Sequence, residues 1–174
     1  AQEYLKCAKD PAYFMRKYCY IQHPTRGRIL FNLYPFQDKI LHLFKDNQYN
    51  IVLKSRQLGI STLSAAYSLW LMIFHKDKNV LALATTQATA RNLVTKVIFM
   101  YDQLPKWLRL PSVEKNKLSL RLKNGSRIAA KSSNADAARS EAVSLLLIDE
   151  AAFIDNIDET FTAAQQTLAT GGQC

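Results

Sequence analysis

The stretch that decides the fold of this sequence is Lys54-Ser55-Arg56-Gln57-Leu58-Gly59-Ile60-Ser61-Thr62. It is related to the phosphate-loop pattern G-x-x-x-x-G-K-[ST], in which backbone N–H groups cradle phosphates at the start of a helix. Aligned on Gly59 and Ser61, it has Lys54 in place of the first glycine and Ile60 in place of the lysine. Phosphates still need nearby positive charge, and Lys54 and Arg56 offer it. The stretch predicts a nucleotide-binding loop with a displaced lysine, and the alternative is an ordinary strand-to-helix turn.

The segments around this loop follow the order that the pattern requires. The apolar run 51–53 predicts a buried strand before the loop, and 62–74 has an apolar face at helical spacing. A second buried strand is predicted at 79–84 and a second long helix at 87–104. Strand–helix–strand–helix order predicts an α/β fold with a mainly parallel sheet sandwiched between helices. Asn124-Gly125, between two strand-like runs, predicts a β-hairpin insertion near 117–131.

Two carboxylates follow a continuous apolar run near the end of the sequence. Leu145-Leu146-Leu147-Ile148 predicts a central parallel strand covered on both faces, and Asp149-Glu150 comes next. Ligands of open α/β sheets bind at this carboxyl edge. We therefore expect Asp149 to hold Mg²⁺ together with Ser61, and Glu150 to activate the attacking water. The alternative is a strand that ends in a solvated acidic turn.

The charge distribution is uneven along the chain. The formal net charge is +9, yet residues 149–174 carry five acids and no Lys or Arg. A basic body with a local acidic patch suits a protein that binds a polyanion and a metal, although a solvated basic surface explains the charge as well. Five bases in and beside the predicted hairpin are candidates for contact with nucleic acid, and the alternative is a solvated hairpin edge that uses lysine to deter aggregation. These bases are Lys115, Lys117, Arg121, Lys123 and Arg127.

The cysteines and the hydropathy bear on the compartment. Cys7, Cys19 and Cys174 are three in number and have no metal-ligand spacing, which favours reduced thiols in a cytoplasm-like compartment. No apolar run approaches the roughly 18–20 residues that cross a bilayer, so we expect no membrane partner.

Tyr34-Pro35-Phe36-Gln37 lies upstream of the loop. An aromatic ring can stack on adenine, and the Gln37 amide offers a donor and an acceptor to the edge of the base. The alternative is that Phe36 belongs to the core and Gln37 simply begins a helix.

Taken together, these motifs resemble the ATPase domain of the large terminase subunit of tailed double-stranded DNA bacteriophages. The resemblance extends from about residue 10 to the end. The residues that carry it are Tyr34-Pro35-Phe36-Gln37, Ser55-Arg56-Gln57-Leu58-Gly59-Ile60-Ser61-Thr62 and Leu147-Ile148-Asp149-Glu150-Ala151-Ala152-Phe153-Ile154. It implies a P-loop NTPase of the ASCE type that uses ATP and Mg²⁺ to move viral DNA into a capsid.

The resemblance also implies roles, partners and a location. Arg56 and Lys54 would contact phosphates, and Arg139 is similar to the arginine finger of the family, although an exposed arginine on a loop is an equal alternative. The implied partners are double-stranded DNA, a homo-oligomeric ring on the portal protein and the small terminase subunit. The implied location is the host cytoplasm, transiently at the procapsid portal vertex. The implied ATP-binding residues are Phe36, Gln37, Lys54, Ser55, Arg56, Gln57, Leu58, Gly59, Ile60, Ser61 and Thr62.

We expect residues 1–48 to form an N-terminal helical and adenine-binding segment, and 49–174 to form the ATPase core. The sequence stops before the coupling motif and the nuclease domain of the resembled family, so we expect a truncated core that need not turn over ATP alone. Other interpretations remain open. They are a helicase-like remodelling ATPase, an inactive fragment that only binds nucleotide or DNA, and a nuclease built on Asp149, Glu150, Asp155, Asp158 and Glu159. Residues 155–159 are expected to begin a helix, where acids favour the positive end of the dipole.

Overall fold

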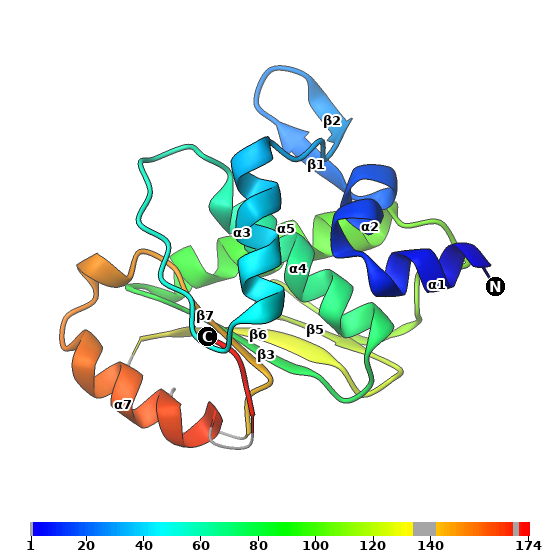
Figure 1. Cartoon of the computed structure of the whole chain (residues 1–174). Helices are drawn as coiled ribbons and strands as arrows, with labels where there is room; N and C mark the ends of the chain where they lie inside the picture. Colours follow the sequence, from blue (N-terminus) through cyan, green and yellow to red (C-terminus); the bar gives the residue numbers. More distant parts are fainter. Residues whose placement is uncertain (1, 134–141, 169–170) are drawn as a thin grey trace.

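A five-stranded mixed sheet forms the centre of the protein (Figure 1). The computed structural model describes residues 2–133, 142–168 and 171–174. The strand order is β4-β5-β6-β3-β7, in which β3 is parallel to both β6 and β7, while β5 is antiparallel to β4 and β6. The strands are β3 (Asn79–Ala84), β4 (Ser112–Lys115), β5 (Ser119–Leu122), β6 (Arg127–Ser132) and β7 (Leu145–Ile148).

The predicted hairpin is present, but it is not an insertion. Its strands β5 and β6 belong to the main sheet, because β6 also pairs with β3 along its full length. The sheet is therefore mixed rather than mainly parallel, and β4, which the sequence analysis did not predict, extends it at the far edge. The alternating segment places Leu120 and Leu122 in the core, so burial of this face fixes the register.

Helices cover the sheet unequally on its two faces. On one face lie α4 (Ile60–Phe74) and α5 (Gln87–Gln103), and on the other lies α7 (Ile157–Leu168) (Figure 1). The side chains of β3 alternate between the two: Val80 and Ala82 join the larger core, and Leu81 packs with α7. This two-sided burial explains the continuous apolar sequence of β3. Because α4 carries no charged residue and is buried over most of its surface, it is a central helix.

The N-terminal segment packs on the outside of α4. It contains α1 (Gln2–Lys9), α2 (Pro11–Tyr18) and α3 (Pro35–Asp46), and it shares its apolar core with α4. The indole Nε1 of Trp70 in α4 donates to the carbonyl of Cys7 at 2.8 Å. The N-terminal segment, expected to be helical, also contains a projecting hairpin formed by β1 (Tyr20–His23) and β2 (Gly27–Leu30) (Figure 1). Cross-strand pairing decides the structure there.

A cluster of polar side chains joins the first two helices. The Glu3 carboxylate accepts hydrogen bonds from Lys17 Nζ at 2.8 Å, Tyr18 Oη at 2.7 Å and Tyr13 Oη at 2.9 Å. These bonds, led by that from Lys17, lower the pKa of Glu3 from its ordinary value near 4.5 to about 2. A lowered carboxyl pKa stabilises the fold above pH 4.5, and this contribution is lost as the pH falls towards 2.

Asp10 caps α2 and gives a direct test of local stability. Its Oδ1 accepts from the backbone N–H groups of Ala12 at 2.8 Å and Tyr13 at 3.1 Å, and Pro11 fills the first helical position. We expect Asp10→Ala to lower the free energy of unfolding by about 1 kcal/mol, because both donors lose their acceptor. Urea denaturation measures this change. Asp46→Ala, at the last residue of α3, is the control; an equal loss there would contradict a capping effect.

Two expectations about the strands beside the loop are wrong. Residues 51–53 form no strand, and Ile51 and Leu53 are fully exposed. Strand β7 is the outermost strand of the sheet rather than a central one, with only a bridge between Leu145 and Gln173 beyond it. An apolar run becomes a buried strand only where another strand pairs with it and other residues cover it. Among the described residues, backbone pairing of this segment ends at residue 50, and none reaches residues 51–53.

A short junction nevertheless links β7 to the segment before the loop. The carbonyl of Gln173 accepts from Leu146 N at 2.7 Å, which ties residue 173 to β7. On its other side, Cys174 N donates to the carbonyl of Gln48 and the Cys174 carbonyl accepts from Asn50 N, each at 2.8 Å. Residues 173–174 therefore connect β7 to residues 48–50. In the part of the chain that the structure describes, no helix is long and apolar enough to span a bilayer.

Candidate nucleotide site

The structure brings Ser61 and Asp149 into direct contact. Ser61 lies in the first turn of α4, and Asp149 follows the last residue of β7. The backbone of Asp149 is held by a 2.9 Å hydrogen bond from its N–H to the carbonyl of Leu83 in β3. The Ser61 hydroxyl then donates to Asp149 Oδ2 at 2.8 Å. A hydroxyl and a carboxylate, 88 positions apart in the sequence, thus meet at the carboxyl edge of the sheet.

The backbone around Gly59 is shaped for an anion. Gln57 and Gly59 have left-handed backbone angles, with φ of 63° and 70°, and α4 begins at Ile60 without a side-chain cap. The first helical hydrogen bond runs from Leu63 N to the carbonyl of Gly59. The preceding N–H groups of the helix therefore have no acceptor within it, and they carry the positive end of the helix dipole. Such an N-terminus accepts phosphate oxygens.

Gln37 ties the start of α3 to this loop. Its side chain is only 1% exposed. Its Oε1 accepts from the backbone N–H of Tyr34 at 3.0 Å, and its Nε2 donates to the carbonyl of Leu58 at 3.0 Å. A Cβ atom at Gly59 would lie 2.8 Å from Gln37 Nε2, so both the positive φ and the approach of Gln37 require glycine there. This contact was not predicted from the sequence, in which a glutamine at the third position of a helix is its only signal.

The aromatic residues beside Gln37 are accessible. Tyr34 and Phe36 stack with nearly parallel rings, 8° apart, and a centroid separation of 5.7 Å. Both side chains are exposed. The pair therefore presents an open aromatic surface next to the loop. Stacking on adenine by Phe36 stays a prediction, and Tyr34, which was not among the predicted site residues, is part of the same surface.

The other residues predicted for the site, including its charged ones, are mostly exposed. Lys54, Ser55, Arg56, Gln57 and Leu58 are all exposed, and neither base of this loop forms an ion pair with another described residue. Glu150 is exposed and has a left-handed φ of 56°; its N–H donates to Asp149 Oδ1 at 3.1 Å. Backbone strain of this kind often marks functional positions. Thr62 is half-buried beside Ser61. Arg139 lies outside the described residues.

The donor set at the site fits Mg²⁺ rather than a metal held by protein alone. Across residues 2–133, 142–168 and 171–174, no group of three or more His, Cys, Asp or Glu side chains could share an ion. Mg²⁺ in nucleotide sites is held by one or two protein oxygens, phosphate oxygens and water, so Ser61 and Asp149 are a suitable pair. The nuclease interpretation gains no support, because Asp158 and Glu159 occupy the first turn of α7, where they favour the helix dipole.

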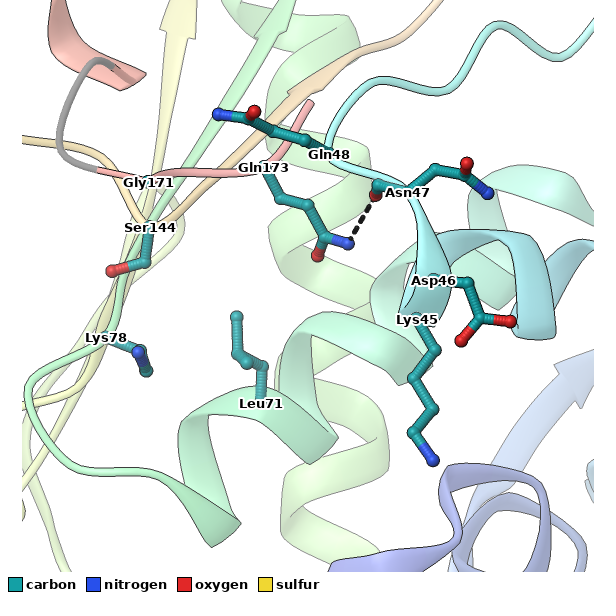
Figure 2. Close-up of a pocket in the computed structure, with 9 residues that line it drawn as sticks. All are labelled: Lys45, Asp46, Asn47, Gln48, Leu71, Lys78, Ser144, Gly171 and Gln173. Carbon is teal, nitrogen blue, oxygen red and sulfur yellow. Dashed lines mark hydrogen bonds between the residues drawn. The ribbon is translucent and has the colours of Figure 1, made fainter.

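A cavity of about 400 Å³ lies away from this site, near the amino-terminal ends of β3 and β7 (Figure 2). Lys78 and Ser144 in its lining directly precede β3 and β7, whereas Asp149 follows β7. Lys45, at the end of α3, lies on the other side of it from Lys78 (Figure 2). We do not assign nucleotide to this cavity, because ligands of such sheets bind at the carboxyl ends of the strands.

Comparison with known proteins identifies similar domains. Residues 51–173 match the family described as terminase large subunit, T4likevirus-type, N-terminal. The fold is similar to the large terminase of bacteriophage HK97, with a TM-score of 0.73 and 18% identity over 91% of this chain and 35% of that one. It is also similar to the large terminase ATPase domain of Thermus phage P74-26, with a TM-score of 0.69 and 17% identity over 82% of this chain and 63% of that one.

A third similar structure is the large terminase of a thermophilic bacteriophage, with a TM-score of 0.61 and 16% identity over 82% of this chain and 37% of that one. At these identities the likeness shows a shared α/β fold with a sheet flanked by helices. The chain spans 35%, 63% and 37% of the length of these three relatives, in the order given.

Proposed function

The chain belongs to the T4likevirus-type terminase large-subunit family, N-terminal part, and on this premise we propose that it is the ATP-hydrolysing domain of a viral DNA-packaging motor. The observation that carries the proposal is the 2.8 Å contact between the Ser61 hydroxyl and Asp149 at the start of α4. A hydroxyl at a helix N-terminus and a carboxylate at a strand end are the protein ligands that a P-loop NTPase of the ASCE type presents to Mg²⁺–ATP.

Binding would use the backbone first. The N–H groups at the start of α4 would cradle the phosphates, and Lys54 and Arg56 would neutralise charge from the exposed side of the loop. Ser61 and Asp149 would hold Mg²⁺, which would supply positive charge beside the phosphates. Phe36 and Tyr34 would stack on the base, because they form the open aromatic surface beside the loop.

Hydrolysis would depend on Glu150. Glu150 has a left-handed φ and directly follows Asp149, the proposed Mg²⁺ ligand, and its exposure leaves the carboxylate available to water. A carboxylate in this position orients the attacking water and accepts its proton. Arg139 is proposed as an arginine finger, supplied to the site of a neighbouring subunit.

The wider assembly is also a proposal, because the chain covers only part of its relatives. Its partners would be double-stranded DNA, a homo-oligomeric ring on the portal protein and the small terminase subunit. It would act in the host cytoplasm, transiently at the procapsid portal vertex. The net charge of +9 supports sequence-independent contact with DNA. Two hairpin bases are already engaged within the chain: Lys115 pairs with Asp102, and Arg127 Nε donates to Asn79.

A helicase-like remodelling ATPase would use the same nucleotide site, and strand-separation assays distinguish it, since a packaging motor moves duplex DNA without unwinding it. An inactive fragment would bind nucleotide or DNA without turnover. Single-turnover hydrolysis with protein in excess over ATP separates this alternative from an active domain.

The hypothesis that Lys54 replaces the usual lysine of the phosphate loop can be tested by measuring nucleotide binding, without measuring hydrolysis. We expect Lys54→Ala to weaken Mg²⁺–ATP binding by about 10- to 100-fold, the loss expected for one or two charge-assisted hydrogen bonds. Isothermal titration calorimetry measures the dissociation constant. Lys76→Ala, an exposed lysine beyond the other end of α4, is the matched control. If only Arg56→Ala weakened binding, the main phosphate charge would come from Arg56 and the displaced-lysine interpretation would be wrong.

A further inference from the structure

We propose that the projecting β1–β2 hairpin is a contact surface for the phosphate backbone of duplex DNA, and that Arg26 and Arg28 make the contact. The choice of DNA as the polyanion rests on the function proposed above, whereas the positive charge of the hairpin is a property of the chain itself. Among the bases of the other hairpin, β5–β6, and its flanks, Lys115 and Arg127 already contact side chains within the chain.

The β1–β2 hairpin contributes little to the core. No residue of either strand is buried, and the two strands project beyond the helices in Figure 1. At the base of the hairpin, Phe31 N donates to the carbonyl of Cys19 at 2.8 Å, and both of these side chains are buried. The hairpin is therefore a ribbon that is anchored at one end and solvated along its length. Because an isolated two-stranded hairpin is only marginally stable, its exposure favours a role in contact with a partner.

The charge of this part of the chain has one sign. Residues 11–37 contain four Arg or Lys and no Asp or Glu. Two of these bases, Arg16 and Lys17, lie before the hairpin and pair with acids outside the run. Within the described part of the chain, no ion pair involves Arg26 or Arg28. Exposed positive charge without a compensating acid attracts a polyanion.

Arg26 lies in the turn at the tip of the hairpin. The backbone N–H groups of Thr25 and Arg26 donate to His23 Nδ1 at 3.3 Å each, which fixes the shape of the turn. A Cβ added at Gly27 would meet nothing within 4 Å, so the space beside the tip is open. The Arg26 side chain is exposed and makes no hydrogen bond with another described residue. Its guanidinium is therefore accessible to a phosphate.

Arg28 lies on β2 and is held in place by two contacts. Its Nη1 donates to Gln103 Oε1, at the end of α5, at 2.7 Å, and its guanidinium lies 5.3 Å from the ring centre of Tyr20. The side chain is nevertheless exposed, and a guanidinium has five N–H donors in a planar fork. The remaining donors can form a bidentate contact with a phosphate. Because the side chain is already oriented, such a contact costs less conformational entropy.

The size of the ribbon suits duplex DNA. Two paired strands of four residues, about 4.8 Å apart and about 13 Å long, fit the major groove, which is about 12 Å wide and about 8.5 Å deep. Contacts with phosphates position a protein on the duplex without reading its sequence. An acidic protein surface offers the same sign of charge without a groove, so the shape of the ribbon favours DNA.

The test measures how the binding of duplex DNA depends on salt. Fluorescence anisotropy of a labelled duplex of mixed sequence gives the affinity of the unsubstituted chain and its variants between about 50 and 200 mM salt. Each phosphate contact contributes about 0.9 to the slope of log affinity against log salt. We expect Arg26→Ala to reduce the slope by about 0.9, and Arg26→Ala combined with Arg28→Ala to reduce it by about 1.8. Affinity at about 50 mM salt should fall about tenfold for each lost contact.

Matched controls separate the hairpin from the net charge of the chain. Lys76→Ala, alone and combined with Lys6→Ala, removes the same formal charge from exposed positions outside the hairpin and should leave the slope unchanged. Arg26→Lys should also keep the slope, because the positive charge remains. Urea denaturation should give the same midpoint for Arg26→Ala and the unsubstituted chain, so a reduced slope in this variant cannot come from unfolding.

An unchanged slope in the double arginine variant would overturn the proposal and favour an acidic protein surface as the partner of the hairpin. An equal reduction in the lysine controls would also overturn it, because binding would then depend on net charge alone. Failure of the unsubstituted chain to bind the duplex would overturn it as well, while ATP hydrolysis would still decide the proposed function. Absence of ATP binding together with the expected slopes would instead contradict the proposed function and support the role of the hairpin.

Discussion

Glu150→Gln is expected to abolish ATP hydrolysis while leaving ATP bound. The amide keeps the shape of the carboxylate but cannot accept the proton of the attacking water, so the rate should fall by about 10²- to 10⁴-fold. Because Glu150 is exposed and is anchored through its backbone N–H to Asp149, the substitution removes no buried contact. The free energy of unfolding should therefore stay within about 0.5 kcal/mol of its original value.

Single-turnover hydrolysis of radiolabelled ATP and calorimetric binding separate the two effects. Glu159→Gln is the matched control, since Glu159 is an acid in the first turn of α7 whose position is explained by the helix dipole. Unchanged hydrolysis in the Glu150 variant would remove this residue from the role of base. A parallel loss of ATP binding would assign Glu150 to the ligand or the metal instead of the water.

Asp149→Asn is expected to remove the benefit that Mg²⁺ brings to ATP binding. The amide oxygen can still accept from the Ser61 hydroxyl, so the contact between α4 and β7 survives, but the negative charge that attracts the ion is gone. Loss of an outer-shell partner at a metal site costs about 10- to 100-fold in affinity, and loss of a direct ligand should cost at least as much. Affinity for ATP with Mg²⁺ should fall to the value measured in EDTA.

The measurement is ATP affinity with and without Mg²⁺ for three proteins: the original chain, Asp149→Asn and the control Asp155→Asn. The original chain and the control should lose affinity when EDTA is added, and Asp149→Asn should be insensitive to it. Ser61→Ala should lose only part of the Mg²⁺ benefit and stay partly sensitive to EDTA, because a hydroxyl is a weaker ligand than a carboxylate. Full Mg²⁺ dependence in Asp149→Asn would show that the ion is held elsewhere.

Local patterns predicted the parts of the fold that are decided locally. Apolar spacing predicted the helix at 62–74, which the structure extends to 60–74, and the strand at 79–84, since burial on one or two faces leaves a direct mark on sequence. The proximity of Ser61 and Asp149 was also predictable, because both follow from where a parallel strand ends and a helix begins. These inferences need only the neighbours along the chain.

The expectations that were wrong depend on partners far away in the sequence. Ile51 and Leu53 have the composition of a buried strand, but pairing with residue 174 stops at Asn50 and leaves them exposed. The contact between Gln37 and Leu58 depends on how α3 packs near α4, which no spacing of residues encodes. Tyr20–His23 lies in a segment that was expected to be helical and becomes a strand because Gly27–Leu30 returns to pair with it.

The junction at residues 173–174 sets the order in which the site can assemble. Asn50 and Cys174 are 124 positions apart, so the segment that leads into the phosphate loop pairs with residues synthesised long after it. Contacts of such long sequence separation carry a large loop-closure cost and form late. A nascent chain would therefore complete α4 and β3 from local sequence while the approach to the phosphate loop was still unpaired. The nucleotide site is then expected to mature among the last parts of the fold.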